Sequence, residues 1–322
     1  MSSVSTSRET TSVLFLQASG LGNSILLSPT LQRLHTSRPD WQVDLYVYRD
    51  LFGAPYEDSN IVDHIIVQDG YWPPSELRRT AYDISICAFP SNRWQYHALN
   101  RFVGADRRIA HDYTVGYWRT LRFLETDLVP AQPGLHDAEQ NMQLLKPLNL
   151  ELDHPPDPQF HLSTADRQEA RHFLNKHGAK NKPLVGVHPG SGPLTWKRAP
   201  LVKFLELIEQ KAPERSMILV FGGPEEQDLK NQARMRIEET LGFPCETVDL
   251  NIKTVAAVID RCDQFISNDT GLSHVAAARK VPSQITIFHG TDPARTRPWR
   301  PDAELIQLKK NQMTYPFTAT SP

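Results

Sequence analysis

The sequence predicts an α/β protein with two parallel-sheet domains, and three observations indicate this class. The chain has 322 residues, which exceeds one average domain and gives each of two domains enough length to bury a core. Continuous apolar runs of strand length, such as 12–16 (SVLFL) and 216–221 (SMILVF), are each followed by a glycine-containing turn and a helical pattern. Residues 152–158 (LDHPPDP) contain three prolines, which disfavour a helix or a central strand, so we place the domain boundary near residue 160.

The predicted domains run from 12 to 160 and from 161 to 322, the second with a C-terminal tail, and residues 1–11 (MSSVSTSRETT) are expected to form a disordered tail. In the first domain we expect strands at 12–16, 41–48, 61–67 and 83–89, a turn at 103–109, and helices at 25–34 and 136–148. In the second domain we expect helices at 164–177, 201–211, 254–259 and 270–278, a charged helix ending near 241, and strands at 183–187, 216–221, 265–266 and 284–288.

Composition excludes several classes of protein. Lys and Arg number 35 against 37 Asp and Glu, so no strongly basic face indicates a nucleic-acid partner. The three cysteines, Cys87, Cys245 and Cys262, form no C-x-x-C pair, which fits a reducing cytoplasm. No apolar run is long enough to span a bilayer and the first residues lack the apolar core of a signal peptide. We therefore expect a cytoplasmic protein with at most peripheral membrane contact.

The segment 264–293 carries the strongest functional signal. A short strand ends at Ser267-Asn268-Asp269, and a helix begins at Thr270-Gly271. The free backbone N–H groups at such a helix start favour an anion, and Gly271 lets a phosphate approach closely. The alternative interpretation is that Asp269 or Thr270 only caps the helix. A second strand is followed by another polar loop at 289–293 (HGTDP). This loop is expected on the sheet edge where open α/β proteins bind ligands.

Three motifs resemble those of a known family, two in the second half of the chain and one in the first. N-D-T-G-L-S-H-x-A-A-A at 268–278 followed by F-x-G-T-D-P at 288–293 resembles the donor-site signature of glycosyltransferase family 9, the ADP-heptose:lipopolysaccharide heptosyltransferases. His188-Pro189-Gly190-Ser191 with Lys197 resembles the family's H-P-G-(A/S)-x…K-x-W-P text, with Ala199 in place of the usual Trp. The segment H-x-x-x-x-N-x-x-L-L beginning at His136 resembles a third family motif.

The resemblance implies a GT-B architecture, in which two Rossmann-like parallel-sheet domains place the active site in the cleft between them. The second domain would then bind the nucleotide-sugar donor and the first would bind the acceptor. Lys197 and Asp269 would be catalytic, and Glu226 would hold the ribose hydroxyls, with Glu225 as the alternative. The donor-binding residues would be Gly190, Ser191, Lys197, Glu226, Asp269, Thr270, Gly271, His274, Thr291 and Asp292.

The first half departs from the family at one chemically important position. The family usually has an Asp that acts as general base where this chain has Asn23, in Gly22-Asn23-Ser24. A carboxamide has no useful basicity. Another carboxylate or a His could serve as base, the acceptor could be an amine that needs little help, or the activity could be weak or lost.

The expected acceptor-binding residues lie in first-domain loops. They are Gly22, Arg93, Trp94, His97 and His136. Arg93 and Trp94 could equally belong to an exposed loop, and a single His is more often structural.

The activity that the resemblance implies is an inverting, metal-independent transfer of a heptose or related sugar from a nucleotide-diphosphate donor, with ADP-heptose as the expected donor. The acceptor would be a lipopolysaccharide core sugar, a protein or a small natural product. No cofactor or metal site is expected, and nucleic acid is not a partner. Two other hypotheses stay open: a nucleotide-sugar-binding protein without transferase activity, motivated by Asn23, and a GT-B epimerase that hydrolyses its donor.

Overall fold

The computed structural model describes residues 10–68, 73–113, 120–152 and 154–308, and these form two compact units. The first unit contains residues up to 19, 27–133 and 137–156; the second contains residues 20–26, 134–136 and from 157 onward. The main change from one unit to the other falls between Pro156 and Asp157, inside the proline-rich segment that suggested the boundary. Residues 1–9 of the predicted tail lie outside the described residues.

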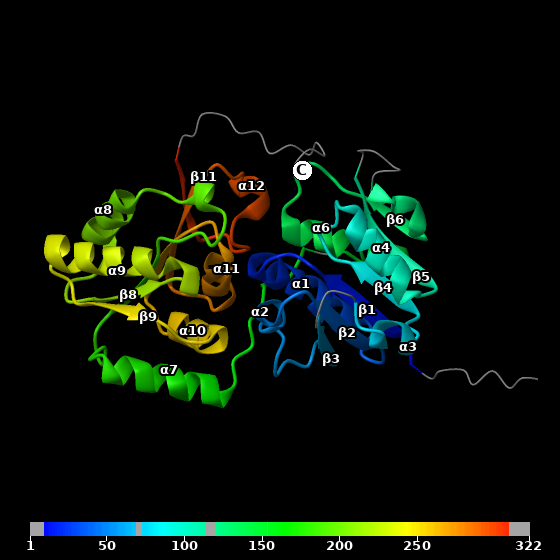
Figure 1. The fold of residues 1–322 in the computed structure, drawn as a ribbon, viewed down its shortest axis with the longest axis horizontal. Helices are drawn as coiled ribbons and strands as arrows, with labels where there is room; N and C mark the ends of the chain where they lie inside the picture. The colour runs from blue at the N-terminus through cyan, green and yellow to red at the C-terminus, as the bar shows by residue number, and fades with distance from the viewer. Residues whose placement is uncertain (1–9, 69–72, 114–119, 153, 309–322) are drawn as a thin grey trace, which may run out of the picture. The chain divides into compact units, whose positions relative to one another are not determined.

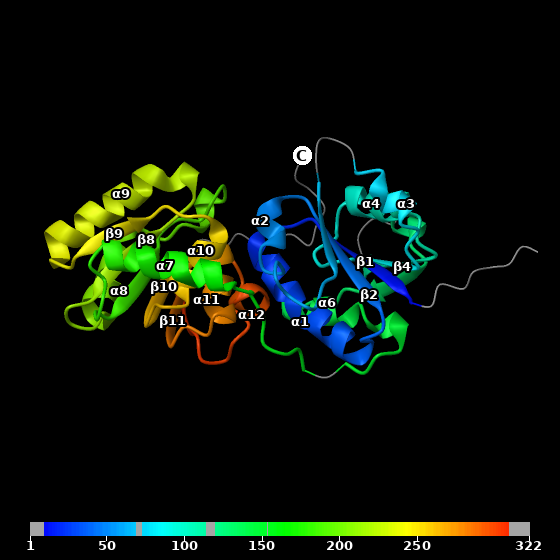
Figure 2. The same ribbon diagram turned by 90° about the horizontal axis from the view of Figure 1, so that it is seen from below.

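The first unit is built on a six-stranded parallel sheet with the order β3-β2-β1-β4-β5-β6. Its elements are β1 (Ser12–Gln17), α1 (Leu21–Ser37), β2 (Gln42–Val47), α2 (Asp50–Gly53), β3 (His64–Val67), α3 (Glu76–Arg79), β4 (Ile84–Cys87), α4 (Trp94–Val103), β5 (Arg107–Asp112), β6 (Asp127–Pro130) and α6 (Asp137–Gln143). Figure 2 shows α1 and α4 on opposite faces of this sheet. Both faces of β1 are buried, which explains its uninterrupted apolar sequence.

The second unit is built on another six-stranded parallel sheet with the order β12-β11-β10-β7-β8-β9. Figure 1 shows this unit from α7 in green through α9 in yellow to α12 in orange. Its elements are α7 (Thr164–Lys176), β7 (Leu184–His188), α8 (Leu201–Lys211), β8 (Met217–Phe221), α9 (Gln227–Arg236), β9 (Cys245–Val248), α10 (Ile252–Ile259), β10 (Gln264–Asn268), α11 (Gly271–Ala278), β11 (Ser283–His289), α12 (Pro293–Thr296) and β12 (Glu304–Leu308). Read in chain order, the strands of each sheet follow the same Rossmann order, 3-2-1-4-5-6. The predicted fold class of two Rossmann-like parallel sheets is therefore confirmed.

Most predicted elements appear within a few residues of their expected bounds. The cap expected at the start of α7 is a full capping box, in which Ser163 and Asp166 bond reciprocally to each other's backbone N–H. The predicted strands 183–187 and 216–221 correspond to β7 and β8, whose residues are all buried. Continuous apolar runs predict central strands of a parallel sheet reliably because both faces are covered.

The prediction failed at the strands toward the sheet edges. The segment 103–109 was expected to be a turn. In the structure Val103 ends α4, Gly104 takes a left-handed conformation, and β5 already starts at Arg107. Strands β6, β9 and β12 were not predicted, and each carries charged or exposed residues. The helix expected at 136–148 ends at Gln143, and Pro147 belongs to a separate 3₁₀ turn. Short strands with few apolar residues give little periodic signal.

Candidate donor-binding site

The predicted donor-site segments meet where the strand order of the second sheet reverses. Strands β7 and β10 are neighbours, although β8 and β9 lie between them in sequence. Their carboxyl ends deliver His188 and Asn268 to the same sheet edge. Open α/β sheets bind ligands in the crevice at such a switch point.

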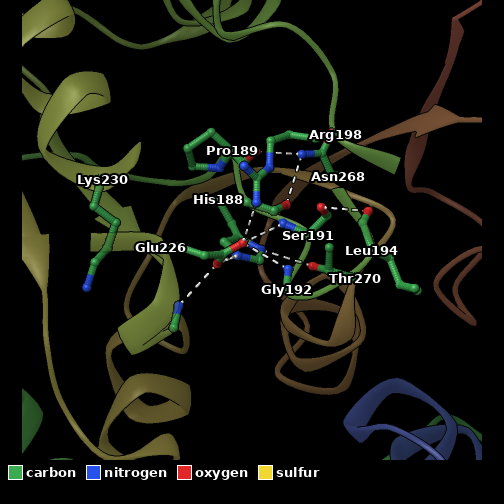
Figure 3. A network of polar contacts seen from close by, with 12 residues as sticks. His188, Pro189, Ser191, Gly192, Leu194, Arg198, Glu226, Lys230, Asn268 and Thr270 are labelled. Carbon is green, nitrogen blue, oxygen red and sulfur yellow. Dashed lines mark hydrogen bonds and ion pairs between the residues drawn. The ribbon is translucent and has the colours of Figure 1, made fainter. Parts of the chain in front are cut away.

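Asn268 ties the two loops of the switch point together. This fully buried side chain donates to the carbonyl oxygens of Pro189 (2.8 Å; Figure 3) and Gly190 (2.9 Å). Its Oδ1 accepts the N–H of Ala199 (3.1 Å). Asn268 was part of the quoted motif but was not predicted as a site residue. The signal available in the sequence was its place at the end of a buried strand.

Lys197 and Asp269 form an ion pair at this edge. The Lys197 Nζ lies 3.0 Å from Asp269 Oδ2, with side-chain exposures of 15% and 3%. Lys197 belongs to a 3₁₀ turn after β7, and Asp269 directly follows β10. The structure thus brings together the two residues predicted to be catalytic in the second domain. The cation keeps part of its surface open to solvent while the carboxylate is covered.

Thr270 directly precedes α11, at the N-cap position, but its side chain does not cap the helix. It adopts an extended conformation and makes no side-chain capping hydrogen bond. Its Oγ1 instead lies 3.0 Å from Nδ1 of His188. The alternative interpretation, in which Asp269 or Thr270 is only a helix cap, is therefore wrong for Thr270. Gly271 is the first residue of α11, so its backbone and that of Leu272 form the positive end of the helix.

The loop after β7 wraps around the carboxylate of Glu226. Glu226 Oε1 accepts the backbone N–H groups of Ser191 (2.7 Å) and Gly192 (2.8 Å). Gly190 packs closely on this carboxylate, because a Cβ at this position would lie 2.2 Å from Oε1 of Glu226 and would displace it. The carboxyl group is buried but these donors, with His188, lower the pKa of Glu226 to about 2. Glu225, the alternative ribose ligand, is exposed.

Comparison with known proteins identifies the family. The family described as glycosyltransferase family 9 (heptosyltransferase) matches residues 74–321. The chain belongs to glycosyltransferase family 9. It is 25% identical over 304 residues to lipopolysaccharide heptosyltransferase 3 of Escherichia coli, covering 86% of this chain and 83% of that protein. It is 33% identical over 136 residues to lipooligosaccharide heptosyltransferase 2 of Haemophilus ducreyi, covering 40% and 38%.

Solved structures show the same fold. A family 9 glycosyltransferase of Veillonella parvula aligns with a TM-score of 0.78 at 20% identity, covering 92% of this chain and 86% of that one. The E. coli heptosyltransferase WaaC with ADP aligns with a TM-score of 0.72 at 19% identity, covering 92% and 93%. These similarities support the predicted GT-B architecture, and the chain is a glycosyltransferase by family membership. The predicted cleft between the domains stays a prediction.

His274 lies in the second turn of this family 9 chain's α11. Its ring is buried, and Nδ1 has no hydrogen-bond partner among the described residues. Burial lowers the pKa of His274 to about 4, so the ring is neutral at pH 7. Gly22, which the second unit includes, packs against it, since a Cβ there would lie 2.6 Å from Cδ2 of His274. Asn23 follows Gly22 in the first turn of α1.

Thr291 and Asp292 occupy the loop after β11. Asp292 caps α12, because its Oδ1 accepts the N–H of Ala294 at 3.0 Å. Thr291 is buried, and its hydroxyl has no partner among the described residues. Asp292 therefore has a structural role, whereas a donor contact by either residue stays a prediction.

The acceptor residues predicted in the first half have different surroundings. Trp94 is 52% exposed at the start of α4, and Arg93 precedes it. His97 was expected to line the pocket, and the structure places it in the interior: its Nδ1 pairs with Glu125 at 2.7 Å and both side chains are 0% exposed. It points inward because it shares a face of α4 with the buried Asn100 and Val103, at successive spacings of three residues.

His136 belongs to the second unit. Its Nε2 bonds to the carbonyl oxygen of Arg297 at 2.8 Å, and its ring packs against Trp299 at 4.5 Å. Burial lowers the pKa of His136 to about 4. A neutral, buried ring bonded to backbone is the structural role that a single His most often has. An acceptor contact stays a prediction.

The described residues give two further findings. They contain no group of three or more His, Cys, Asp or Glu side chains arranged to hold a metal ion. They also contain no helix with the length and apolar character needed to cross a bilayer.

Proposed function

We propose that this glycosyltransferase transfers a heptose or a related sugar from a nucleotide-diphosphate donor, with ADP-heptose as the first candidate. The observation that carries the proposal is the meeting of Lys197, Asp269 and the N-terminus of α11 at the switch point between β7 and β10. A cation and a helix N-terminus at one sheet edge suit a diphosphate.

In the proposed reaction the acceptor attacks the anomeric carbon from the side opposite the nucleotide, which inverts the configuration. The new bond forms as the bond from that carbon to the diphosphate oxygen breaks, and the electron pair leaves with the diphosphate. Lys197 and the N–H groups of Gly271 and Leu272 stabilise this developing charge. The positive charge would come from these protein groups, so the proposal requires no metal.

The proton of the acceptor needs a separate destination. Asn23 cannot take it, because a carboxamide is not a useful base. Asp269 is paired with Lys197 and would orient the donor. An amine acceptor, or a base supplied by another residue, fits the proposal.

The relatives supply the choice of donor and the range of acceptors. One similar structure is a heptosyltransferase with ADP, and another is an ADP-heptose lipopolysaccharide heptosyltransferase of E. coli. The relatives are named for lipopolysaccharide or lipooligosaccharide. We propose a lipopolysaccharide core sugar as the first acceptor to test, with protein and small-molecule acceptors next, and a cytoplasmic location for the reaction.

Calorimetric titration with ADP, UDP and GDP, each without metal, tests the donor. Selective ADP binding is expected, followed by transfer from ADP-heptose to hydroxyl or amine acceptors. Preference for another base would remove ADP from the proposal. Donor binding with no transfer to any acceptor would favour a sugar-nucleotide-binding protein, and release of free sugar would favour hydrolysis.

A further inference from the structure

The ammonium group of Lys197 has a second neighbour besides Asp269. Its Nζ lies over the ring of Trp196, 5.8 Å from the ring centroid. At this distance the electron-rich face of an indole attracts a cation, and tryptophan does so more strongly than the other aromatic residues. Lys197 is therefore held on one side by a carboxylate at 3.0 Å and on another by an aromatic face.

The position of Trp196 is unusual for the motif. The family text K-x-W-P has its tryptophan two residues after the lysine, where this chain has Ala199, and Trp196 instead directly precedes Lys197. Ala199 is buried and belongs to the hydrophobic core of the second unit. The chain thus has a small side chain where the motif enters the core, and it has its indole ring at the ammonium group.

A short 3₁₀ turn, Thr195–Lys197, brings the two side chains together. The carbonyl oxygen of Leu194 accepts the N–H of Lys197 at 2.9 Å, so the backbone of the turn is closed by its own hydrogen bond. The lysine stem, by contrast, is long and flexible, and each contact of its ammonium group removes some of its rotamers. A second contact therefore restricts the position of Nζ further.

The two neighbours act differently on the positive charge. Asp269 hydrogen-bonds to the ammonium group and balances its charge, so it competes with an anionic ligand for Lys197. The Trp196 ring carries no net charge, and it attracts the cation through the quadrupole of its π-system. An ammonium group has three N–H donors, and the side chain of Lys197 keeps 15% of its surface exposed. The ring can thus hold the cation in place and leave donors and charge for a phosphate oxygen.

We infer that Trp196 is a positioning residue of the donor site, whose ring holds the ammonium group of Lys197 where charge develops on the leaving diphosphate. The inference rests on the proposed function for the role of Lys197. It requires no contact between Trp196 and the sugar, the base or the diphosphate.

A double-mutant cycle on ADP and pyrophosphate binding tests this role. Calorimetry compares wild type, Trp196→Leu, Lys197→Ala and the double variant, and circular dichroism checks each fold. We expect Trp196→Leu to weaken the binding of both ligands by about threefold to tenfold, the scale of one partly exposed cation–π contact. In the Lys197→Ala background the same substitution should change either affinity by less than about twofold, because the ring then has no cation to hold.

Two further variants sharpen the cycle. Trp196→Phe keeps an aromatic face with a weaker attraction for a cation, so it should retain more affinity than Trp196→Leu. Leu194→Ala is the matched control, because it removes an apolar side chain that is 42% exposed in the same loop. This control should bind both ligands as wild type does.

Other outcomes would overturn the inference. Equal losses from Trp196→Leu with and without Lys197 would mean that the ring contacts the ligand or supports the loop independently of the cation. A loss for ADP but not for pyrophosphate would mean that the ring contacts the base or the ribose. Failure of the proposed function looks different, because wild type itself would then bind neither ligand.

A measurement without ligand covers the case in which Trp196→Leu does not fold. The ring current of an indole shifts protons over its face upfield, so the ε-methylene protons of Lys197 report the contact in NMR spectra of wild type. Their signal is assigned by its loss in Lys197→Ala. We expect an upfield shift that Leu194→Ala keeps and Trp196→Phe reduces. Chemical shifts typical of an exposed lysine would contradict the contact and the inference with it.

Discussion

The two switch points of this chain share a topology and differ in chemistry. In the first unit the loop after β4 is anchored by neutral groups: Asn141 Oδ1 accepts the N–H of Phe89 (2.8 Å) and the Tyr113 hydroxyl accepts the N–H of Ser91 (2.8 Å). In the second unit the loop after β7 is anchored by the charged Glu226. The same strand order thus supports an aromatic, neutral loop in one sheet and a charged, anion-suited loop in the other. The residues after the strands determine the chemistry, and the sheet only places them.

The largest effect is expected from Lys197→Ala. Loss of the cation beside the leaving diphosphate should reduce sugar transfer at least roughly 10²-fold, the usual scale for one such donor. Transfer is measured by chromatography of ADP released from ADP-heptose, and circular dichroism checks the fold. Lys203→Ala is the control, since Lys203 pairs with Glu206 on α8 at a more exposed site. Wild-type turnover in Lys197→Ala would show that the cation at this switch point does not stabilise the leaving diphosphate.

Gly190→Ala tests whether the charged loop tolerates any side chain. Its Cβ would clash with the Glu226 carboxylate, so we expect a loss of about 1–3 kcal/mol in unfolding free energy and weaker ADP binding. Gly223→Ala is the matched control, because its Cβ meets nothing within 4 Å. Denaturant unfolding and calorimetry measure both. Equal behaviour of the two variants would contradict the close packing of Gly190 on Glu226.

Asn268→Ala and Asn141→Ala compare the two loops directly. Each substitution removes a buried side chain that hydrogen-bonds to backbone groups. The expected loss of unfolding free energy is about 1–3 kcal/mol for each backbone group left without a partner. We expect both variants to be destabilised and only Asn268→Ala to lose ADP affinity. Thermal unfolding and titration with ADP measure the two effects. A comparable loss of ADP affinity in Asn141→Ala would show that the neutral loop also serves the donor.

Lowering the pH should destabilise the fold through His274. Its pKa falls from an ordinary 6.5 to about 4 in the folded chain, so the unfolded chain binds the additional proton between these values. The stability that His274 contributes is present above pH 6.5 and is lost as the pH falls toward 4, by about 2 kcal/mol at pH 5. Unfolding measured at pH 7 and pH 5 should show a smaller difference in His274→Gln. An unchanged difference would mean that His274 is protonated or exposed.

The smallest effect is expected from Asn23→Asp. If another group is the base, or if the acceptor is an amine, adding a carboxylate changes turnover by less than about tenfold. The rate of sugar transfer is measured across pH 6–9. An increase of 10² or more, with a new acidic limb in the pH profile, would show that the missing base limits this enzyme.

The sequence by itself determined the fold class and most of the donor segments. Buried parallel strands such as β7 and β8 are read from continuous apolar runs, and the motif around Asp269 and Thr270 lies within one contiguous stretch. Signals of this kind can be recognised from a short stretch of sequence, without knowledge of the rest of the chain. The charged strand β5 and the edge strand β12 give no such signal, and they were missed.

Only the tertiary structure decided which side chains work together. Asn268 and Ala199 are brought together by the pairing of β10 with β7, and Glu226 reaches the 190–192 loop because β8 lies on the other side of β7. The burial of His97 against Glu125 likewise depends on a partner distant in sequence. A residue type and its local pattern indicate what a side chain can do. The long-range pairing of strands determines which groups it contacts, as the bonds from the 191–192 backbone to Glu226 show.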